Sequence, residues 1–355
     1  MEEQEPNLPQ SETGQYERIH QTVTAEFTVE ESFIEYNTPT FYVTSQPNLK
    51  QAFLRLYKQL DSMQLVPLLR KRENRLMLQI VPKPPVKPSR PLINILLLLA
   101  TIATTLVTGY LLAGPAANPW LDAIMFSVAL LSILGAHEMG HKLTANRHRV
   151  EATYPYFIPG IPPLPTFGAV IQQKSLPPNK DALFDLGISG PLIGFLVTLI
   201  VTILGLKLSV IVSEIPPGGQ PLVTPLLFDF LGALFGPTGE GSVLLVHPVA
   251  YAGYIGMIVT MLNLMPVGQF DGGHIAHVLF GNTTIGTALS LVAIISMLFI
   301  SWPMALLAYF LSRAKHPDSL DGVSKLSLSR KLATIVPIAI FILSVAPIAP
   351  IFDLF

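Results

Sequence analysis

The stretch GAHEMGH, residues 135–141, lies inside an apolar run that covers about residues 120–143. His137 and His141 are four residues apart, so in a helix both imidazoles lie on one face and can reach one metal ion. Glu138 projects near the same ion without needing to ligate it, which is where a general base belongs. Such side chains are costly in a membrane-spanning helix, so this stretch predicts a functional metal site.

The composition indicates a polytopic helical membrane protein whose surroundings are a lipid bilayer. Of the 355 residues, 50% are hydrophobic and 13% are charged, and several apolar runs reach 18 residues or more. The net charge is −1 and no basic block carries interleaved aromatic residues, which argues against nucleic acid as a partner. The chain has no cysteine, so a metal would depend on histidine and carboxylate ligands. The first apolar run begins near Leu92, and we expect no cleaved signal peptide.

Before the apolar runs, the sequence predicts three segments. Residues 1–23 are polar and rich in Glu and Gln, which favours a disordered lead. Residues 24–81 predict a small cytosolic α+β domain, with strands near 27–29 and 41–43, a helix after the N-cap candidate Asn48, and a hairpin over 65–80. Its role is left open between regulation or substrate sensing and a plain folded extension. Residues 82–91 form a stiff, Pro-rich linker.

Residues 92–350 predict a membrane-embedded domain of about six to seven transmembrane helices. The stretch 284–311 is either one long helix or two short ones broken at Ser301-Trp302-Pro303, and the break is favoured because Pro303 removes a backbone donor. The break gives seven crossings, and a continuous helix gives six. The other predicted spans are residues 92–112, 120–143, 183–212, 248–264 and 332–348.

Lysine and arginine are concentrated in alternate loops. They lie between the second and third spans and before the last span, whereas loops 113–119 and 214–246 contain none. By the positive-inside bias, the N-terminal domain and the loops after spans two, four and six are cytoplasmic. The sequence therefore predicts a multi-pass protein of the cell membrane, or of an equivalent internal membrane.

A third ligand is expected from the segment NLMPVGQFDGGH, residues 263–274. His137 lies about 26 Å along the second span and the start of this segment about 23 Å along the fourth, at nearly the same depth. Pro266 ends the helix and the glycines allow a tight return into protein, so Asp271 can reach the level of the histidines. His274 stays open as an alternate or supporting ligand. The plainer alternative is an ordinary helix end with Asp271 as its cap.

Together these segments resemble the site-2 protease family of intramembrane zinc metalloproteases, which pairs a membrane-embedded HExxH with a later NxxPxxxxDG. The two motifs are residues 137–141 and 263–272 here. The resemblance extends over about residues 92–350, closest to the branch found in archaea, cyanobacteria and plastids, and leaves out the N-terminal domain. It also covers three minor segments, which are residues 166–171 (TFGAVI), 187–191 (GISGP) and 316–321 (HPDSLD).

The resemblance implies one Zn²⁺ per chain, with His137, His141 and Asp271 as its ligands. It implies that Glu138 activates the water and that Asn263 hydrogen-bonds substrate or the developing oxyanion. The expected activity is that of a metalloendopeptidase that cuts a membrane-protein substrate in or near a transmembrane segment. Two other functions are kept open, a metal-binding transporter or channel and a non-catalytic membrane scaffold.

A short β-prone segment is the expected substrate platform. Residues 166–172 are apolar and too short to span a membrane, so we predict a re-entrant β-hairpin whose edge strand holds unwound substrate by β-augmentation. A plain cytosolic hairpin is the alternative. Residues 226–235 predict an interfacial helix or lid, with a packed loop as the alternative. The substrate's identity and the oligomeric state stay open. The residues expected near substrate are Phe167, Gly168, Ala169 and Val170.

Overall fold

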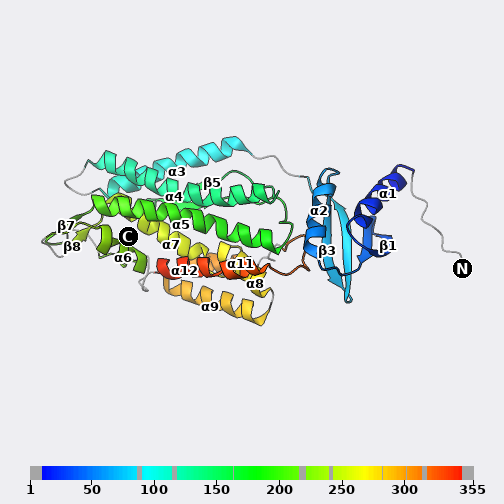
Figure 1. Cartoon of the computed structure of the whole chain (residues 1–355). Helices are drawn as coiled ribbons and strands as arrows, with labels where there is room; N and C mark the ends of the chain where they lie inside the picture. Colours follow the sequence, from blue (N-terminus) through cyan, green and yellow to red (C-terminus); the bar gives the residue numbers. More distant parts are fainter. Residues whose placement is uncertain are drawn as a thin grey trace. The chain divides into compact units, whose positions relative to one another are not determined.

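The computed structural model divides the chain into two compact units, each described here by itself (Figure 1). The N-terminal unit consists of residues 1–87, 175–182 and 317–326, and the helical unit of residues 88–174, 183–316 and 327–355. The structure describes residues 10–85, 90–113, 118–162, 164–215, 221–239, 243–281, 283–300, 302–313 and 318–345.

The N-terminal unit is built on a four-stranded antiparallel sheet with strand order β1-β2-β4-β3. Each hairpin turns through two residues with positive φ, at Tyr36-Asn37 and at Glu73-Asn74, the conformation that matches the twist of paired strands. Apolar residues of α2 recur at helical spacing and are buried within the unit. Its elements are α1 (Gln10–Thr24), β1 (Val29–Glu35), β2 (Thr38–Val43), α2 (Leu49–Asp61), β3 (Leu65–Arg72) and β4 (Arg75–Pro82).

The strands, hairpin and helix predicted within residues 24–81 are present. Asn48 stands at the N-cap of α2, but its side chain makes no capping hydrogen bond. The predicted disordered lead is wrong for residues 10–23, which belong to α1. Ile19 and Val23 are buried and Tyr16 packs against the same core, so three apolar residues at helical spacing hold this polar segment. Residues 1–9 of that predicted lead lie outside the described residues.

Among the described residues, three helices are long and apolar enough to cross a membrane, namely α3 (Pro91–Leu111), α4 (Pro119–Arg147) and α5 (Lys180–Leu208). α4 packs against both α3 and α7. Since α7 and α9 are apolar but have only 16 and 17 residues, the count of six to seven crossings stays a prediction. The remaining helices are α6 (Leu226–Phe235), α7 (Pro248–Asn263), α8 (Asp271–Phe280), α9 (Thr284–Ile300), α10 (Trp302–Arg313), α11 (Leu328–Ala333) and α12 (Ile335–Ser344).

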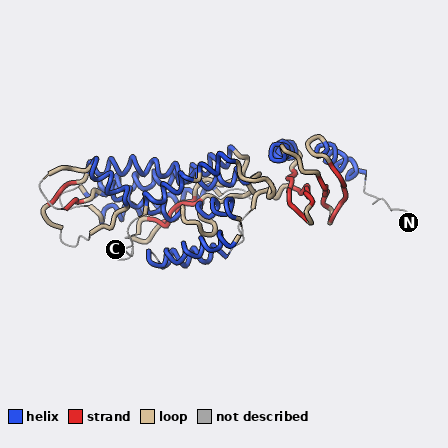
Figure 2. The backbone as a smooth tube through the Cα atoms, turned by 60° about the horizontal axis from the view of Figure 1, so that its bottom comes forward, coloured by secondary structure: helices blue, strands red, loops and turns tan. Residues whose placement is uncertain are grey.

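Two short antiparallel ribbons interrupt these helices (Figure 2). β5 (Tyr156–Pro159) pairs with β6 (Thr166–Val170), which is the β-hairpin that the sequence predicts. β7 (Val210–Val212) pairs with β8 (Val243–Leu245), so the span predicted to continue to residue 212 ends at Leu208 instead. The β-branched run 210–212 finds a partner strand, and this pairing overrides the apolar pattern that suggested helix.

Two further expectations concern residues 284–311 and residues 226–235. The favoured break in residues 284–311 is present, because α9 ends at Ile300 and α10 begins at Trp302. Residues 226–235 form the predicted helix α6, which buries Leu227, Phe228 and Leu231. Whether α6 acts as a lid stays a prediction.

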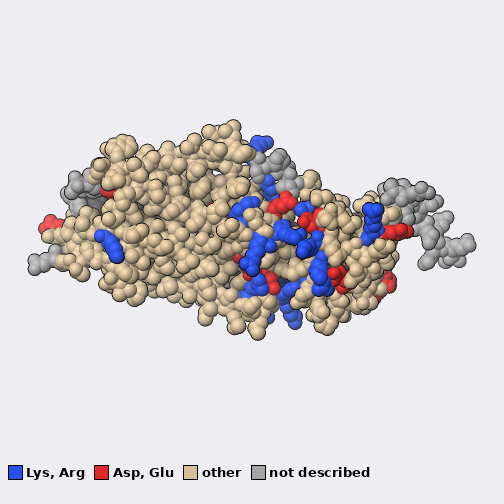
Figure 3. All heavy atoms as spheres, turned by 45° about the horizontal axis from the view of Figure 1, so that its top comes forward, with Lys and Arg blue, Asp and Glu red and all other residues tan. Residues whose placement is uncertain are grey.

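The surface of the helical unit suits a lipid environment. Large apolar side chains are exposed along its long helices, such as Leu99 of α3 at 57%, Val128 of α4 at 63% and Ile200 of α5 at 59%. Figure 3 shows that charged side chains are nearly absent over most of this unit on the face in view. Exposed apolar patches of this extent are rare on proteins surrounded by water. We conclude that this is a membrane protein.

Candidate metal centre

Helix α4 carries the first three residues of the predicted site. His137, Glu138 and His141 are all buried within the unit. The i, i+4 spacing places both imidazoles on one face, and the two Nε2 atoms are 3.2 Å apart. One carboxylate oxygen of Glu138 lies within 4.8 Å of a ring nitrogen of each histidine. Two nitrogen donors and one acid thus converge on a single point inside the protein.

Asp271, the first residue of α8, meets these histidines from 134 positions further along the chain. Its Oδ2 is 3.2 Å from Nε2 of His137 and its Oδ1 is 3.3 Å from Nε2 of His141. The structure therefore brings Asp271 of the second motif to the two histidines of the first motif.

Glycines close the turn that delivers Asp271. Between α7 and α8 the chain passes through Gly268 with φ +50°, a conformation that favours glycine. A Cβ on Gly272 would lie 2.0 Å from the carbonyl oxygen of Leu264, and one on Gly273 would lie 2.3 Å from that of Gly268. Only glycine fits at these two positions, which explains why the Asp is followed by Gly-Gly.

The three donor groups have the spacing that zinc requires. Ligands about 2.0–2.1 Å from a tetrahedral ion lie roughly 3.3–3.4 Å from one another. Nε2 of His137 is 3.2 Å from Nε2 of His141 and 3.2 Å from Oδ2 of Asp271, and Oδ1 of Asp271 is 3.3 Å from Nε2 of His141. Glu138 stands further off, with Oε1 4.0 Å from Nε2 of His137. Two neutral imidazoles and one carboxylate suit zinc and leave a fourth position open, so the residues fit the ion.

Helix α5 fixes the orientation of the His141 ring. Nδ1–H of His141 donates a hydrogen bond to the carbonyl oxygen of Leu186 at 2.8 Å, which leaves Nε2 free to ligate a metal. A Cβ on Gly190 would lie 2.0 Å from His141 Nε2, and one on Gly194 would lie 2.9 Å from His137 Cβ. Both glycines therefore make room for the two imidazole rings.

Two other residues singled out from the sequence lie beside this point. Nδ2 of Asn263, at the end of α7, is 3.3 Å from Nε2 of His137. His274 is in the first turn of α8 and packs closely against α5. A Cβ added to Gly187 of α5 would lie 3.2 Å from the Cβ of His274. The structure therefore brings Asn263 and Asp271 to the histidines, and His274 stays an open candidate for a supporting role.

The β5–β6 hairpin runs past the same centre. The backbone of Ile171, which follows β6, hydrogen-bonds the Glu138 carboxylate. Ala169 packs in the core cluster of α4 and α7, whereas Phe167 and Val170 are 60% and 49% exposed. Gly168 has φ +100° and open space around its α-carbon. The four residues predicted to lie near substrate therefore form one partly exposed strand beside the candidate base.

Helix α3 holds this hairpin at two places. Nδ2 of Asn94 donates to the carbonyl oxygens of Tyr154 and Pro155 at 3.1 and 3.0 Å. Ten residues further along α3, Oγ1 of Thr104 donates to the carbonyl oxygen of Pro165 at 2.8 Å. These two anchors are about 15 Å apart along the helix, so the hairpin lies along α3.

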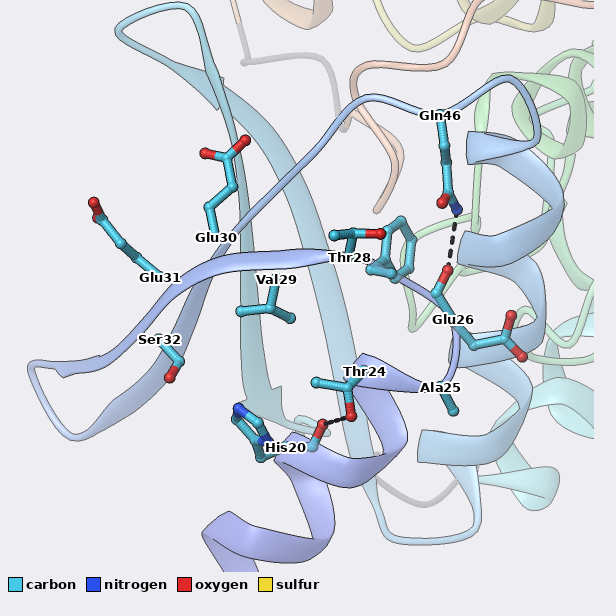
Figure 4. A pocket seen from close by; sticks show the side chains of 11 residues that line it. His20, Thr24, Ala25, Glu26, Thr28, Val29, Glu30, Glu31, Ser32 and Gln46 are labelled. Carbon is cyan, nitrogen blue, oxygen red and sulfur yellow. Dashed lines mark hydrogen bonds between the residues drawn. The ribbon is translucent and has the colours of Figure 1, made fainter.

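A separate concave region lies in the N-terminal unit (Figure 4). It is lined by acidic and polar side chains around the start of β1, but these carboxylates already have partners. Glu26 pairs with Arg55 at 2.8 Å, and Glu30 and Glu31 each pair with Arg75 at 3.2 Å. This region therefore offers no convergent set of ligands comparable to that on α4 and α8.

Comparison with known proteins identifies the family to which this chain belongs. The model of peptidase family M50 matches residues 125–302, half of the chain, and includes both motifs. The probable zinc metalloprotease EGY1, chloroplastic, is 30% identical over 242 residues in Oryza sativa subsp. japonica and over 246 residues in Arabidopsis thaliana. The probable zinc metalloprotease EGY2, chloroplastic, of Arabidopsis thaliana is 28% identical over 208 residues. The chain belongs to peptidase family M50.

These matches cover only part of each protein. The aligned regions are 64%, 65% and 54% of this chain and 41%, 44% and 36% of the three relatives, in the same order. The chain thus spans less than half the length of the curated relatives it matches. No solved structure matches it significantly.

Proposed function

We propose that this chain is an intramembrane zinc endopeptidase that hydrolyses a peptide bond in or near a transmembrane segment of another membrane protein. One observation carries the proposal, the convergence of His137, His141 and Asp271 at tetrahedral spacing beside Glu138. Membership of family M50 and the similarity to probable zinc metalloproteases of plants support the same activity.

The ligands and the base have separate tasks. His137, His141 and Asp271 would hold one zinc ion, which would supply the Lewis acidity to make water nucleophilic at neutral pH and to polarise the substrate carbonyl. Glu138 accepts a proton as the amide carbonyl is attacked and returns it to the leaving amine. Its distance from the ring nitrogens leaves room for the water that it activates. Nδ2 of Asn263 hydrogen-bonds the oxyanion that develops on the substrate.

The substrate must be unwound before it can react, because a helix hides its carbonyl groups in its own hydrogen bonds. Strand β6 offers a place for the released backbone. It carries Phe167, Gly168, Ala169 and Val170 and leads directly to the residue that contacts Glu138. An extended substrate segment added to this edge would lie beside the metal centre. The pairing β5–β6 leaves one edge of β6 without a strand among the described residues.

From the lysine and arginine distribution, we infer that the N-terminal unit and the metal-centre end of α4 are cytoplasmic. Arg147, six residues after His141, is the last residue of α4. The basic loop that follows it is the one that the positive-inside bias assigns to this side. Cleavage near the cytoplasmic face would release the cytosolic part of a substrate. We infer that the protein is a multi-pass protein of the cell membrane or of an equivalent internal membrane.

The test is cleavage of a model transmembrane substrate by the purified protein in liposomes. We expect cleavage that stops on chelation, returns with zinc, and falls roughly 10²–10⁴-fold in Glu138→Gln while bound zinc is retained. Met139→Leu, at the neighbouring and more exposed position, is the matched control and should keep full activity. Undiminished cleavage by Glu138→Gln would refute the assigned base. Metal flux that persists in Glu138→Gln, with no cleavage, would point to a transporter instead.

A further inference from the structure

The β3 edge of the N-terminal sheet is covered by chain from a distant loop. The N–H of Leu69 donates to the carbonyl oxygen of Leu320 at 3.0 Å, and the N–H of Gly322 donates to that of Leu69 at 3.1 Å. The two segments pair in parallel. Nη1 of Arg70 donates to the same Leu320 oxygen at 2.7 Å. Residues 320–322, which lie between α10 and α11, therefore extend the sheet as a short fifth segment.

A second loop continues this edge. The N–H groups of Leu320 and Asp321 donate to the carbonyl oxygens of Pro177 and Pro178 at 2.9 and 3.0 Å, and Asn179 forms a parallel bridge with Asp321. Residues 177–179 precede α5. The β3 edge of this sheet is thus covered by two segments from within residues 92–350, the predicted membrane-embedded domain.

The side chains of Leu320 and Asp321, at this edge, are buried within the N-terminal unit. Leu320 is 4% exposed and belongs to the same hydrophobic core as Leu69. Asp321 is fully buried, and its Oδ1 accepts hydrogen bonds from the N–H groups of Val323 and Ser324 at 3.0 and 2.9 Å. Oδ2 of Asp321 has no hydrogen-bond partner among the described residues. The two hydrogen bonds to Oδ1 nevertheless close a turn at residues 321–324, so this segment is a formed structural element.

A second contact joins α2 to the first turn of α5. Nζ of Lys50 lies 3.0 Å from Oδ2 of Asp181, and the two side chains are only 20% and 12% exposed. Oδ1 of Asn179 accepts the N–H of Ala182 and caps the same helix. The β3 edge and α2 therefore both hold the chain where α5 begins.

We propose that the N-terminal unit is an intramolecular clamp, whose β3 edge and α2 bind the loops of residues 175–182 and 318–326. This gives a role to the segment containing Leu320 and Asp321, which the proposed function leaves without one. Four residues after the clamped turn of α5, Leu186 supports the ring of His141. The clamp is thus a positioning device for the metal centre, a consequence that rests on the proposed function.

The absence of cysteine from the chain allows a direct test. In the full-length protein, cysteines replace Lys50 and Asp181, and a cleavage site for a sequence-specific protease is inserted within residues 84–89. The two cysteines are first cross-linked with a short bifunctional thiol reagent, and the chain is then cleaved at the inserted site. We expect most of the cut chain to stay full length on a denaturing gel. Lys58→Cys with Asp181→Cys is the control pair, about 12 Å further along α2, and should separate into two pieces.

A third variant removes the apolar contact at the other end of the clamp. Leu320→Asp puts a charge into the core of the N-terminal unit and should abolish the Lys50/Asp181 cross-link, whereas Leu328→Asp, at a position 71% exposed, should not. Equal cross-linking by the two cysteine pairs would overturn the clamp, even if every variant is folded. None of these outcomes depends on peptidase activity, so failure of the clamp and failure of the proposed function are distinguishable.

Discussion

The metal centre and the β5–β6 hairpin lie next to each other but are built in opposite ways. His137, Glu138 and His141 are 4%, 6% and 9% exposed and stand on one long helix, whereas Phe167 and Val170 of β6 are 60% and 49% exposed. Bond-making residues need fixed geometry and gain it from burial on a rigid element. A strand that receives different unwound segments needs an open edge and few side-chain constraints. If the proposed function holds, the catalytic residues are held rigidly and the strand that binds substrate tolerates different sequences.

Beyond the loss of the base Glu138, the largest effect should come from Asn263, which lies in the buried metal centre. Replacing it with Ala removes the amide that lies 3.3 Å from Nε2 of His137. We expect kcat to fall roughly 10²–10³-fold with little change in KM, because the hydrogen bond is made in the transition state. Steady-state kinetics on a model substrate measures this. A change confined to KM would show that Asn263 binds ground-state substrate instead.

A smaller effect is expected from the contact between α4 and α5. In Gly190→Ala the new Cβ would lie 2.0 Å from Nε2 of His141, so the ring must turn or the helices must part. We expect zinc affinity to fall roughly 10–100-fold, as for other changes around metal ligands. Gly232→Ala is the matched control, since nothing lies within 4 Å of its added Cβ. Competition with a zinc chelator gives both affinities, and equal values would refute the tight fit around His141.

The smallest effect should come from the open strand. In Phe167→Ala an exposed ring on β6 is lost while the backbone edge stays intact. We expect KM to rise by a few-fold with kcat unchanged, because main-chain hydrogen bonds carry most of the binding. A mutation to proline at the same position, which removes a backbone donor, should do more harm than the loss of the ring. A large fall in kcat for Phe167→Ala would mean that this strand is part of the rigid centre.

Local patterns account for the parts of the structure that were predictable from sequence. The i, i+4 spacing of His137 and His141 fixes their geometry within one helix, and the turn chemistry of residues 263–273 brings Asp271 back to them. The hairpin over residues 65–80 follows from two apolar runs around a polar turn. Each of these features depends on neighbours within a few residues.

The features that sequence missed depend on distant neighbours. α1 is held by three apolar residues in a polar stretch, which composition alone cannot distinguish from disorder. The carbonyl of Leu186 that orients His141 is a backbone group and has no sequence signature. Residues 320–322 pair with β3 across about 250 positions, so no local pattern reveals that they complete the N-terminal sheet.

The central claim is that residues from α4 and α8 share one zinc ion. Anomalous diffraction at the zinc edge, from crystals of the zinc-loaded protein, tests it most directly. We expect a single peak about 2.0–2.2 Å from Nε2 of His137, Nε2 of His141 and one carboxylate oxygen of Asp271. A peak bound by the histidines but out of reach of Asp271 would contradict it, as would full zinc occupancy in Asp271→Ala.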